Sequence, residues 1–224
     1  MTEILYIAND VLPALWRGLL VSLALIAPSM VFGLMGGILL GVARVYGPSG
    51  LRSLSNGIVL VFRGFPLVIQ LYIWYFGLPR IGIFLSPYTA SVLGFVFCSA
   101  AYHSEYIRGA LLSIRRGQLF AGQAIGLSSF QTIRYVILPQ AIRRALPGCG
   151  NEIIYLIKYS SLAYMITCIE LTGEGKIIAS ASFKYFEVFM IVGAIYLLLV
   201  SVASRGLEAV ENRLAIPGFE RYRS

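Results

Sequence analysis

Charged residues and the residue types of soluble active sites are scarce in this sequence. Only 12% of the 224 residues are charged and 58% are hydrophobic, whereas soluble domains carry roughly twice that charged fraction. One histidine and three cysteines without C-x-x-C spacing give no pattern typical of a zinc or redox site. With a mean hydropathy of +0.80, the composition predicts a polytopic membrane protein.

Two further absences narrow the function. The sequence has no G-x-x-x-x-G-K-[ST] motif and no glycine-rich turn after a strand, so we expect no nucleotide or other cofactor site in this chain. No Ser/His/Asp or Cys/His set meets at the end of an apolar stretch, and no metal site is expected. We interpret Cys98, Cys149 and Cys168 as small buried hydrophobic residues. Energy for any transport is therefore expected to come from another subunit.

Five apolar stretches are candidates to cross a bilayer as helices. They lie at about residues 18–43, 57–77, 88–106, 152–168 and 188–204. We expect an all-α membrane protein with five transmembrane helices in one transmembrane domain over residues 1–224. Residues 1–16 are expected to form a short interfacial helix, and the charged tail is expected to fray after Pro217.

Glycine recurs every four residues in the first stretch, at Gly33, Gly37 and Gly41. One face of this helix therefore has no side chains, and another helix can approach its backbone closely. Packing against a helix of the same chain is the favoured interpretation, and packing against a second subunit is the alternative.

The charged residues divide unequally between the two sides of the predicted membrane. The side of the N-terminus carries four basic and five acidic residues, whereas the other side carries twelve basic and five acidic residues. Arg63 and Lys158 lie inside predicted spans and complete the net charge of +8. Because cytoplasmic loops are enriched in lysine and arginine, we expect the C-terminus in the cytoplasm and the N-terminus outside. A positive charge explained by topology does not indicate nucleic acid as a partner.

A long loop at about residues 113–147 joins the third and fourth predicted spans on the positive side. Small residues dominate its first half, namely Ala121, Gly122, Ala124 and Gly126. They predict a short helix that another backbone can approach closely, because no large side chain holds that backbone away. Gly126 is predicted to adopt a positive φ and end this helix.

A second, amphipathic helix is predicted in the same loop. Ser128 and Gln131 have the spacing of a capping box that begins a helix. Pro139 is expected to end it, because a proline disfavours helical geometry in the residue before it. The loop therefore has the pattern of a docking element on the aqueous side of a membrane protein.

Four short motifs occur in order along the chain. They are Arg63-Gly64-Phe65-Pro66-Leu67-Val68-Ile69-Gln70, the small-residue turn from Gly117 to Gly126, Ile137-Leu138-Pro139-Gln140-Ala141, and Asn151 followed by Lys158-Tyr159-Ser160-Ser161-Leu162. Together they resemble the R-G-T-P-L-L-V-Q signature, the EAA loop and the K-x-[ST]-[ST]-L segment of permease subunits in binding-protein-dependent ABC importers. The polar amino acid branch of that family is the most similar, and the resemblance covers roughly residues 15–213.

This resemblance implies an assembly in the bacterial cytoplasmic (inner) membrane. Two permease subunits, as a homodimer or heterodimer, would form one path for a polar amino acid or close relative. Two ATPases would bind ATP and Mg²⁺, and an extracytoplasmic substrate-binding protein would deliver the substrate, so this chain itself would not be catalytic. The residues assigned to the ATPase contact are Phe120, Ala121, Gly122, Gly126 and Pro139. Phe120 stands where the family has the glutamate of its EAA motif.

Arg63 and Lys158 are the two basic residues inside predicted spans. A cation within a membrane is costly, and it usually faces a bundle interior, a partner or a water-filled path. Either residue could attract a substrate carboxylate. Alternatively, Arg63 could bind carbonyls freed by the Pro66 bend or pair with an acid such as Glu152. The structural role is favoured for Arg63, and the sequence does not choose for Lys158.

The remaining candidates for the substrate path are Gln70, Asn151, Ser160 and Ser161. Such groups can bind an amino acid, but they also bond between helices. Tyr159 occupies the place where the family often has an acid, which weakens the case for a cationic substrate held there. An ion-coupled secondary transporter or channel subunit is the alternative function, although the predicted spans contain no carboxylate relay. An intramembrane enzyme is disfavoured by the lack of a catalytic set.

Overall fold

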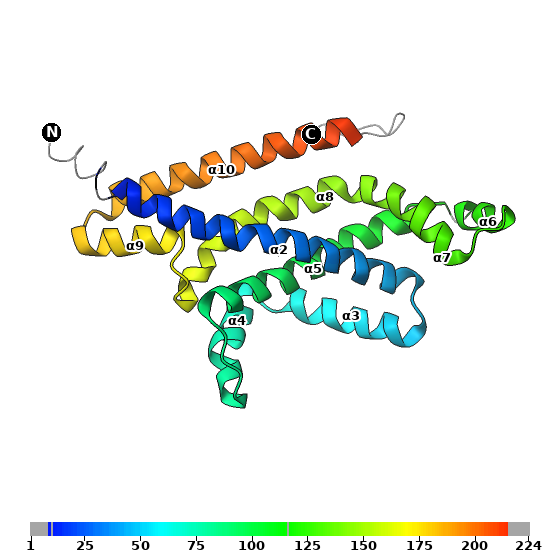
Figure 1. Ribbon diagram of the computed structural model, residues 1–224, viewed down its shortest axis with the longest axis horizontal. Coiled ribbons are helices and arrows are strands. Elements are labelled where there is room, and N and C mark those ends of the chain that lie inside the picture. Colours follow the sequence, from blue (N-terminus) through cyan, green and yellow to red (C-terminus); the bar gives the residue numbers. More distant parts are fainter. Residues whose placement is uncertain (1–8, 10, 116, 215–224) are drawn as a thin grey trace.

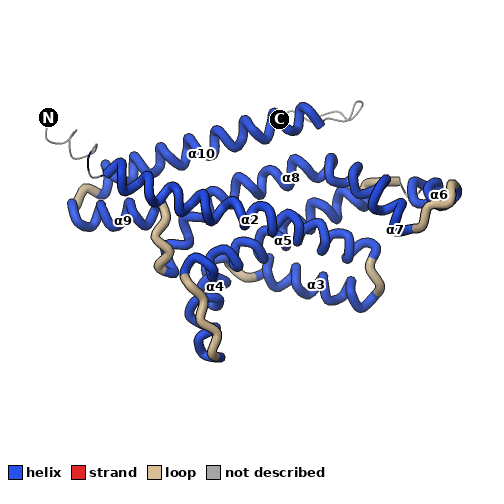
Figure 2. The backbone as a smooth tube through the Cα atoms, viewed as in Figure 1, coloured by secondary structure: helices blue, strands red, loops and turns tan. Residues whose placement is uncertain are grey.

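The computed structural model describes residues 9, 11–115 and 117–214, which form helices with no strand among them (Figures 1 and 2). The all-helical fold expected from the sequence is therefore confirmed for the described residues. In chain order the elements are α2 (Leu12–Tyr46), α3 (Ser49–Gly64), α4 (Leu67–Tyr72), η2 (Ile73–Gly77), η3 (Leu78–Ile81), α5 (Pro87–Leu112), α6 (Gly117–Ala124), α7 (Ser129–Thr132), η4 (Ile133–Ile137), α8 (Leu138–Tyr159), η5 (Ser160–Ile166), α9 (Leu171–Ser182) and α10 (Tyr185–Leu214). The predicted interfacial helix at residues 1–16 falls mostly outside the described residues, and so does the tail after Pro217.

The helices differ in their ability to cross a membrane. By length and composition, α2 and α10 qualify alone, with 35 and 30 residues. Two bent pairs qualify when each pair is taken as one broken span: α3 with residues 67–81, bent by 103°, and residues 129–166 with α9, bent by 53°. The described chain therefore supports two to four spans, and α5 is not among them. The count of five spans stays a prediction.

The glycine stripe of α2 packs against α5, as expected for contact within the chain. A Cβ atom on Gly33 would lie 2.8 Å from the Ser99 hydroxyl oxygen. On Gly41 it would lie 2.8 Å from a methyl carbon of Ile107, and on Gly37 it would meet the Cβ of His103. The two longest inner helices therefore touch along a line where any side chain on α2 would separate them.

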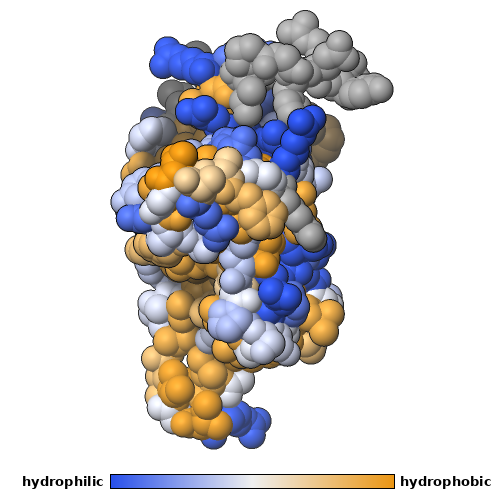
Figure 3. Space-filling view, turned by 90° about the vertical axis from the view of Figure 1, so that its right-hand side faces the viewer, coloured by the Kyte–Doolittle hydropathy of each residue, from blue (hydrophilic) through white to orange (hydrophobic). Residues whose placement is uncertain are grey.

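The second predicted span is broken rather than straight. Helix α3 ends at Gly64, and α4 begins at Leu67 after Pro66, which cannot donate a backbone hydrogen bond. The Gln70 amide donates to the carbonyls of Phe62 and Phe65, both at 2.9 Å, and so satisfies groups that the break exposes. Residues 67–86 form an arm that leaves the bundle below α5 (Figure 1). Most of the arm's visible surface is hydrophobic (Figure 3).

The prediction that Pro139 ends the amphipathic helix is wrong. The helical run that begins at Ser129 continues through η4 and α8 to Ile166, and Pro139 lies in the first turn of α8. The π-helical turn η4 ends at Ile137, two residues before the proline. A π-helical turn is wider than an α-helical one and is a local departure from the α-helical hydrogen-bond pattern. The side-chain amide of Gln140 donates to the Val136 carbonyl at 2.8 Å. Helix α8 therefore begins at Leu138, well before the predicted fourth span at residue 152.

A buried acid joins the helices at the end of the molecule opposite α6. The Glu170 carboxylate caps α9 by accepting from the amides of Thr172 and Gly173, each at 3.0 Å. It also accepts from the hydroxyls of Ser22 on α2 and Tyr196 on α10, at 3.2 and 2.9 Å. Three helices therefore converge on one carboxylate, which is wholly buried.

Candidate functional site

The loop after α5 forms a compact helical element that we call the coupling segment, residues 117–137. It projects at one end of the molecule (Figure 1). Gly126 has a φ of 87° and ends α6, as predicted. The capping box is also confirmed, because the Ser128 hydroxyl accepts from the Gln131 amide at 3.2 Å and the Gln131 side chain accepts from the Ser128 amide at 2.8 Å.

The small residues of the coupling segment do not all face outward. Gly122 is buried, and a Cβ atom there would collide with the Thr132 side chain. Gly122 therefore lets α6 pack on α7, while Ala121 stays exposed. The outer surface also presents large apolar side chains, with Phe120 66% and Ile125 79% exposed. An exposed apolar surface of this kind is typical of a protein contact.

Two contacts hold the base of the coupling segment, where the chain leaves α5 and enters α8. The Arg144 guanidinium of α8 donates to the backbone and side-chain oxygens of Ser113, at 2.8 and 2.9 Å. Ile137 is buried in a hydrophobic cluster that includes Ile107 and Leu111 of α5. A displacement of α6 and α7 would therefore be carried into both α5 and α8.

The candidate path residues fall into two groups. Three of them donate side-chain hydrogen bonds to backbone carbonyls. Gln70 donates to carbonyls at the break after α3, Ser160 to the Ile157 carbonyl and Ser161 to the Lys158 carbonyl. The other three, Arg63, Asn151 and Lys158, are exposed. The first three side chains therefore bond to the backbone, and the last three are accessible, Arg63 while it also binds Glu105.

Arg63 has a structural partner, but that partner is not Glu152. Its guanidinium donates to Glu105 at 2.8 Å, and the carbonyls near Pro66 are bound by Gln70 instead. Glu152 lies buried on α8, and its Oε1 atom has no hydrogen-bond partner. The predicted structural role of Arg63 is therefore supported, whereas Glu152 as its partner is wrong.

Glu105 is the important residue that sequence reasoning missed. Its carboxylate accepts from Arg44 of α2 at 2.9 Å, from Arg63 of α3, and from Arg108 of α5 at 3.1 Å. The spacing of Arg108 three residues after Glu105 was a visible signal. The other two arginines are distant in sequence and meet the acid only through the packing of α2 and α3 against α5.

Tyrosines near the accessible cations were also missed. The Arg63 guanidinium lies 5.3 Å from the centre of the Tyr102 ring, and the Lys158 ammonium lies 5.2 Å from that of Tyr155. The Tyr155 and Tyr159 rings stack with centroids 5.8 Å apart. The signal in the sequence was the recurrence of tyrosine at positions 155 and 159, one helical turn apart.

Comparison with known proteins identifies the family. Residues 33–216 match the binding-protein-dependent transport system inner membrane components. The chain belongs to this family. The permease is 36% identical over 208 residues to the probable amino-acid permease protein YxeN of Bacillus subtilis (strain 168), covering 92% of this chain and 93% of that protein. It is 39% identical over 211 residues to the glutamine transport system permease protein GlnP of Escherichia coli (strain K12), covering 92% and 94%.

Solved structures show the same fold. The permease superposes on a crystal structure of an amino acid ABC transporter with histidines at a TM-score of 0.81, with 32% identity over 90% of this chain and 94% of the other. The MetNI methionine ABC transporter in an inward-facing conformation gives a TM-score of 0.79 at 22% identity, covering 93% and 99%, and shows likeness of fold alone. The resemblance to ABC importer permeases of the polar amino acid branch is thereby confirmed.

Proposed function

We propose that the permease forms half of the translocation path of an ATP-driven importer for a polar amino acid or a close relative. The amino acid substrate is supported by relatives named as amino-acid and glutamine permeases. The observation that carries the proposal is the coupling segment, an exposed, well-capped helical element that joins α5 to a single long helical run. A second permease subunit would complete the path across five spans per subunit.

The partners would divide the chemistry among them. Two cytoplasmic ATPases bind ATP with Mg²⁺ and hydrolyse it, and an extracytoplasmic binding protein delivers the substrate. The permease contributes no catalytic residue and no cofactor. Its C-terminus and the coupling loop at residues 113–147 lie in the cytoplasm, and its N-terminus lies outside, as the charge distribution predicts.

Coupling would follow from the continuity of one helix. The run from Ser129 to Ile166 spans roughly 55 Å at the α-helical rise, and it carries the coupling segment at one end and Lys158 near the other. When the ATPases close on Phe120, Ala121 and Ile125, the displacement passes along this stiff run to the accessible polar side chains. Such a motion exchanges two states that bind substrate and nucleotide differently, which is alternating access.

Lys158 and Asn151 are the best candidates for lining the path, because both are exposed on α8. Seven residues separate them, so they share one helical face. Ser160 and Ser161 bond instead to backbone carbonyls of α8 at the point where this helix passes into η5. Glu152 is only 3% exposed and so lies off this accessible face of α8.

Affinity purification from the native membrane tests the proposed partners. We expect mass spectrometry to find a P-loop ATPase at a stoichiometry equal to that of the permease subunits. A second permease sequence in the complex would indicate a heterodimer, and its absence would indicate a homodimer. Recovery of the permease without any ATPase, from a preparation that still transports, would contradict the proposal.

A further inference from the structure

The arm lies at the depth of the membrane core. Helix α2 qualifies as a membrane span and carries no charge from residue 18 to residue 43. Gly33 of α2 meets Ser99 of α5, so Phe97, two residues before Ser99, lies near the middle of that uncharged stretch. The Trp74 ring of the arm stacks on the Phe97 ring, with centroids 5.4 Å apart. The arm therefore leaves the bundle inside the hydrocarbon layer and not at its surface.

The tip of the arm stays inside the membrane as well. Residues 67–81 are bent by 103° from α3, and α3 runs alongside α2 (Figure 1), so the arm extends sideways from the bundle. The chain returns to the bundle at Tyr88, whose hydroxyl donates to the Ala24 carbonyl of α2 at 2.9 Å. Ala24 belongs to the uncharged stretch of α2. The arm therefore both leaves and rejoins the bundle within the membrane.

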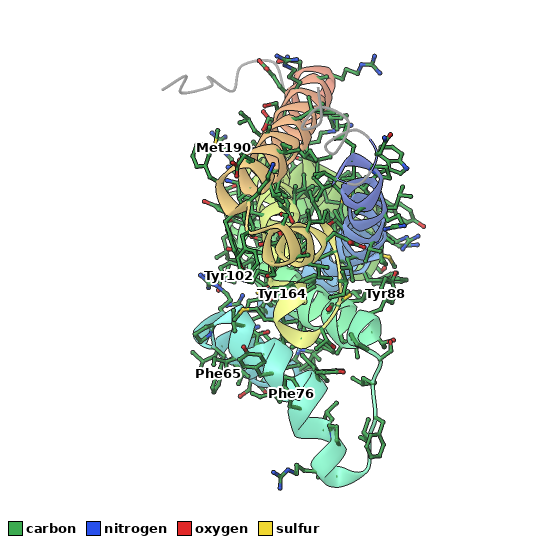
Figure 4. The ribbon with its side chains drawn as sticks, turned by 90° about the vertical axis from the view of Figure 1, so that its left-hand side faces the viewer. Phe65, Phe76, Tyr88, Tyr102, Tyr164 and Met190 are labelled. Atoms are coloured by element: carbon green, nitrogen blue, oxygen red, sulfur yellow. The ribbon has the colours of Figure 1, made fainter. Side chains whose placement is uncertain are left out.

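The side chains of the arm are exposed in the single chain. Figure 4 shows the arm pointing away from the bundle, with Phe65 near its base and Phe76 farther along it. Phe76 is 55% exposed, Ile81 72% and Phe84 80%. Arg80 is exposed too, and it forms no ion pair within the described part of the chain. The described residues therefore leave both apolar and charged groups of the arm uncovered.

The backbone at the tip is incompatible with a lipid environment. Residues 83–86 are not helical, and the amides of Phe84 and Leu85 donate to no acceptor among the described residues. Non-helical backbone occurs at membrane depth only where protein or a water-filled cavity covers it, and an arginine at this depth has the same requirement. The large apolar side chains beside them are unfavourable in water. A protein surface is the cover that suits both kinds of group.

Of the proposed partners, the second permease subunit is the one that reaches this depth. The ATPases and the substrate-binding protein would lie in water on the two sides of the membrane. We propose that the arm of each permease subunit docks on the other subunit within the membrane core. This inference rests on the proposed function, from which it takes the second subunit, and it adds the element that makes the contact. The receiving surface should be apolar, with an acid or carbonyl groups placed for Arg80 and the free amides.

Photocrosslinking in the assembled importer tests this contact. The photoreactive residue p-benzoylphenylalanine replaces Phe84, and the permease is placed in phospholipid nanodiscs with the ATPase that co-purifies. After irradiation we expect a covalent product with the mass of two permease subunits, and mass spectrometry should place its far end in a membrane helix of the second subunit. Ile81 provides a second position. Both side chains are exposed, so their replacement should not disturb the fold of their own subunit.

Trp74 is the matched control. It belongs to the same arm but stacks on Phe97 of its own chain, so the photoreactive residue placed there should give several-fold less product between subunits. Adducts with phospholipid alone, crosslinks to the ATPase alone, or no product between subunits at either tip position would each overturn the inference. An equal yield from position 74 would overturn it too. Failure of the proposed function is a different result, in which no ATPase co-purifies, whereas a crosslink between two permease subunits can still form.

Discussion

Glu105 holds three helices together at a single carboxylate. Arg44, whose side chain is only 9% exposed, donates to it and also to Asn56 and Ser104. Arg63 and Arg108 are about four-tenths exposed at their side chains. The carboxylate therefore neutralises one nearly buried cation and two that water can partly solvate. Its loss would leave Arg44 without the one acid that pairs with it among the described residues.

Replacing Glu105 by glutamine should strongly destabilise the permease. Removing one partner of a largely buried ion pair costs about 3 kcal/mol, because the remaining charge is left uncompensated. Arg108→Gln is the control and should cost about 0–1 kcal/mol, as exposed pairs do. Thermal unfolding of both purified variants in the same detergent measures the difference. Equal midpoints for the two variants would show that the carboxylate does not organise the three helices.

Gly37 tests the contact between α2 and α5. A methyl group at this position would collide with the Cβ of His103, which is buried. We expect Gly37→Ala to reduce the yield of folded permease and to lower its unfolding midpoint, because overpacking of a close helix contact costs about 1–3 kcal/mol.

Gly57→Ala is the matched control for Gly37→Ala. Gly57 is also inside a helix, but a Cβ atom there meets nothing within 4 Å. This variant should be unchanged or slightly more stable, since alanine favours a helix by up to about 1 kcal/mol over glycine. A fully stable Gly37→Ala variant would contradict the close packing of the two helices.

The coupling segment is the element whose local structure could be read best from the sequence. Its capping residues and Gly126 are adjacent in sequence, so the signals are local and the structure matches them. The end of the helix at Pro139 could not be read in this way. A proline in the first turn of a helix and a proline after its end look alike in sequence, and the π-helical turn that precedes Pro139 is set by geometry rather than by a residue signature.

The candidate site could be predicted from the sequence only in part, because it depends on contacts between helices that are distant in sequence. The sequence indicated Arg63, Lys158 and Asn151 as candidate path residues and favoured a structural role for Arg63, but it did not show that Arg63 would meet Glu105. The pairing depends on the packing of α3 against α5. Patterns along the sequence do not contain that packing, which also brings Arg63 over the Tyr102 ring.

Gly126→Val tests the turn of the coupling segment. The position has a φ of 87° and open space around a Cβ atom, so backbone conformation is the only structural demand on it. A left-handed conformation costs a non-glycine residue about 1–2 kcal/mol, and more for a β-branched one. We expect this variant to assemble poorly with the ATPase, or to hydrolyse ATP without transport.

Gly117→Val is the comparison for Gly126→Val. Gly117 also has open space for a side chain, but it has no positive φ. It should therefore retain more coupled transport than Gly126→Val when uptake is measured per ATP hydrolysed. Equal behaviour of the two variants would remove the turn from the coupling mechanism.

The whole molecule has an elongated helical bundle with the coupling segment at one end and the α9 helix at the other (Figure 1). The loop at residues 113–147, which contains the coupling segment, carries five arginines, namely Arg115, Arg116, Arg134, Arg143 and Arg144. If charge sets the orientation, a fluorescent protein fused after residue 224 should fluoresce in the cytoplasm, whereas an alkaline phosphatase fused there should be inactive. An active phosphatase fusion would reverse the proposed topology and place the coupling segment away from any cytoplasmic ATPase.

ATP-driven uptake is the most direct test of the central claim. The permease would be reconstituted in liposomes with its co-purified ATPase and its binding protein, and uptake of labelled glutamine would be followed in two settings. We predict uptake when ATP is supplied on the ATPase side without an ion gradient, and none with an ion gradient alone. Uptake driven by the ion gradient in the absence of ATP would contradict the account and identify a secondary transporter.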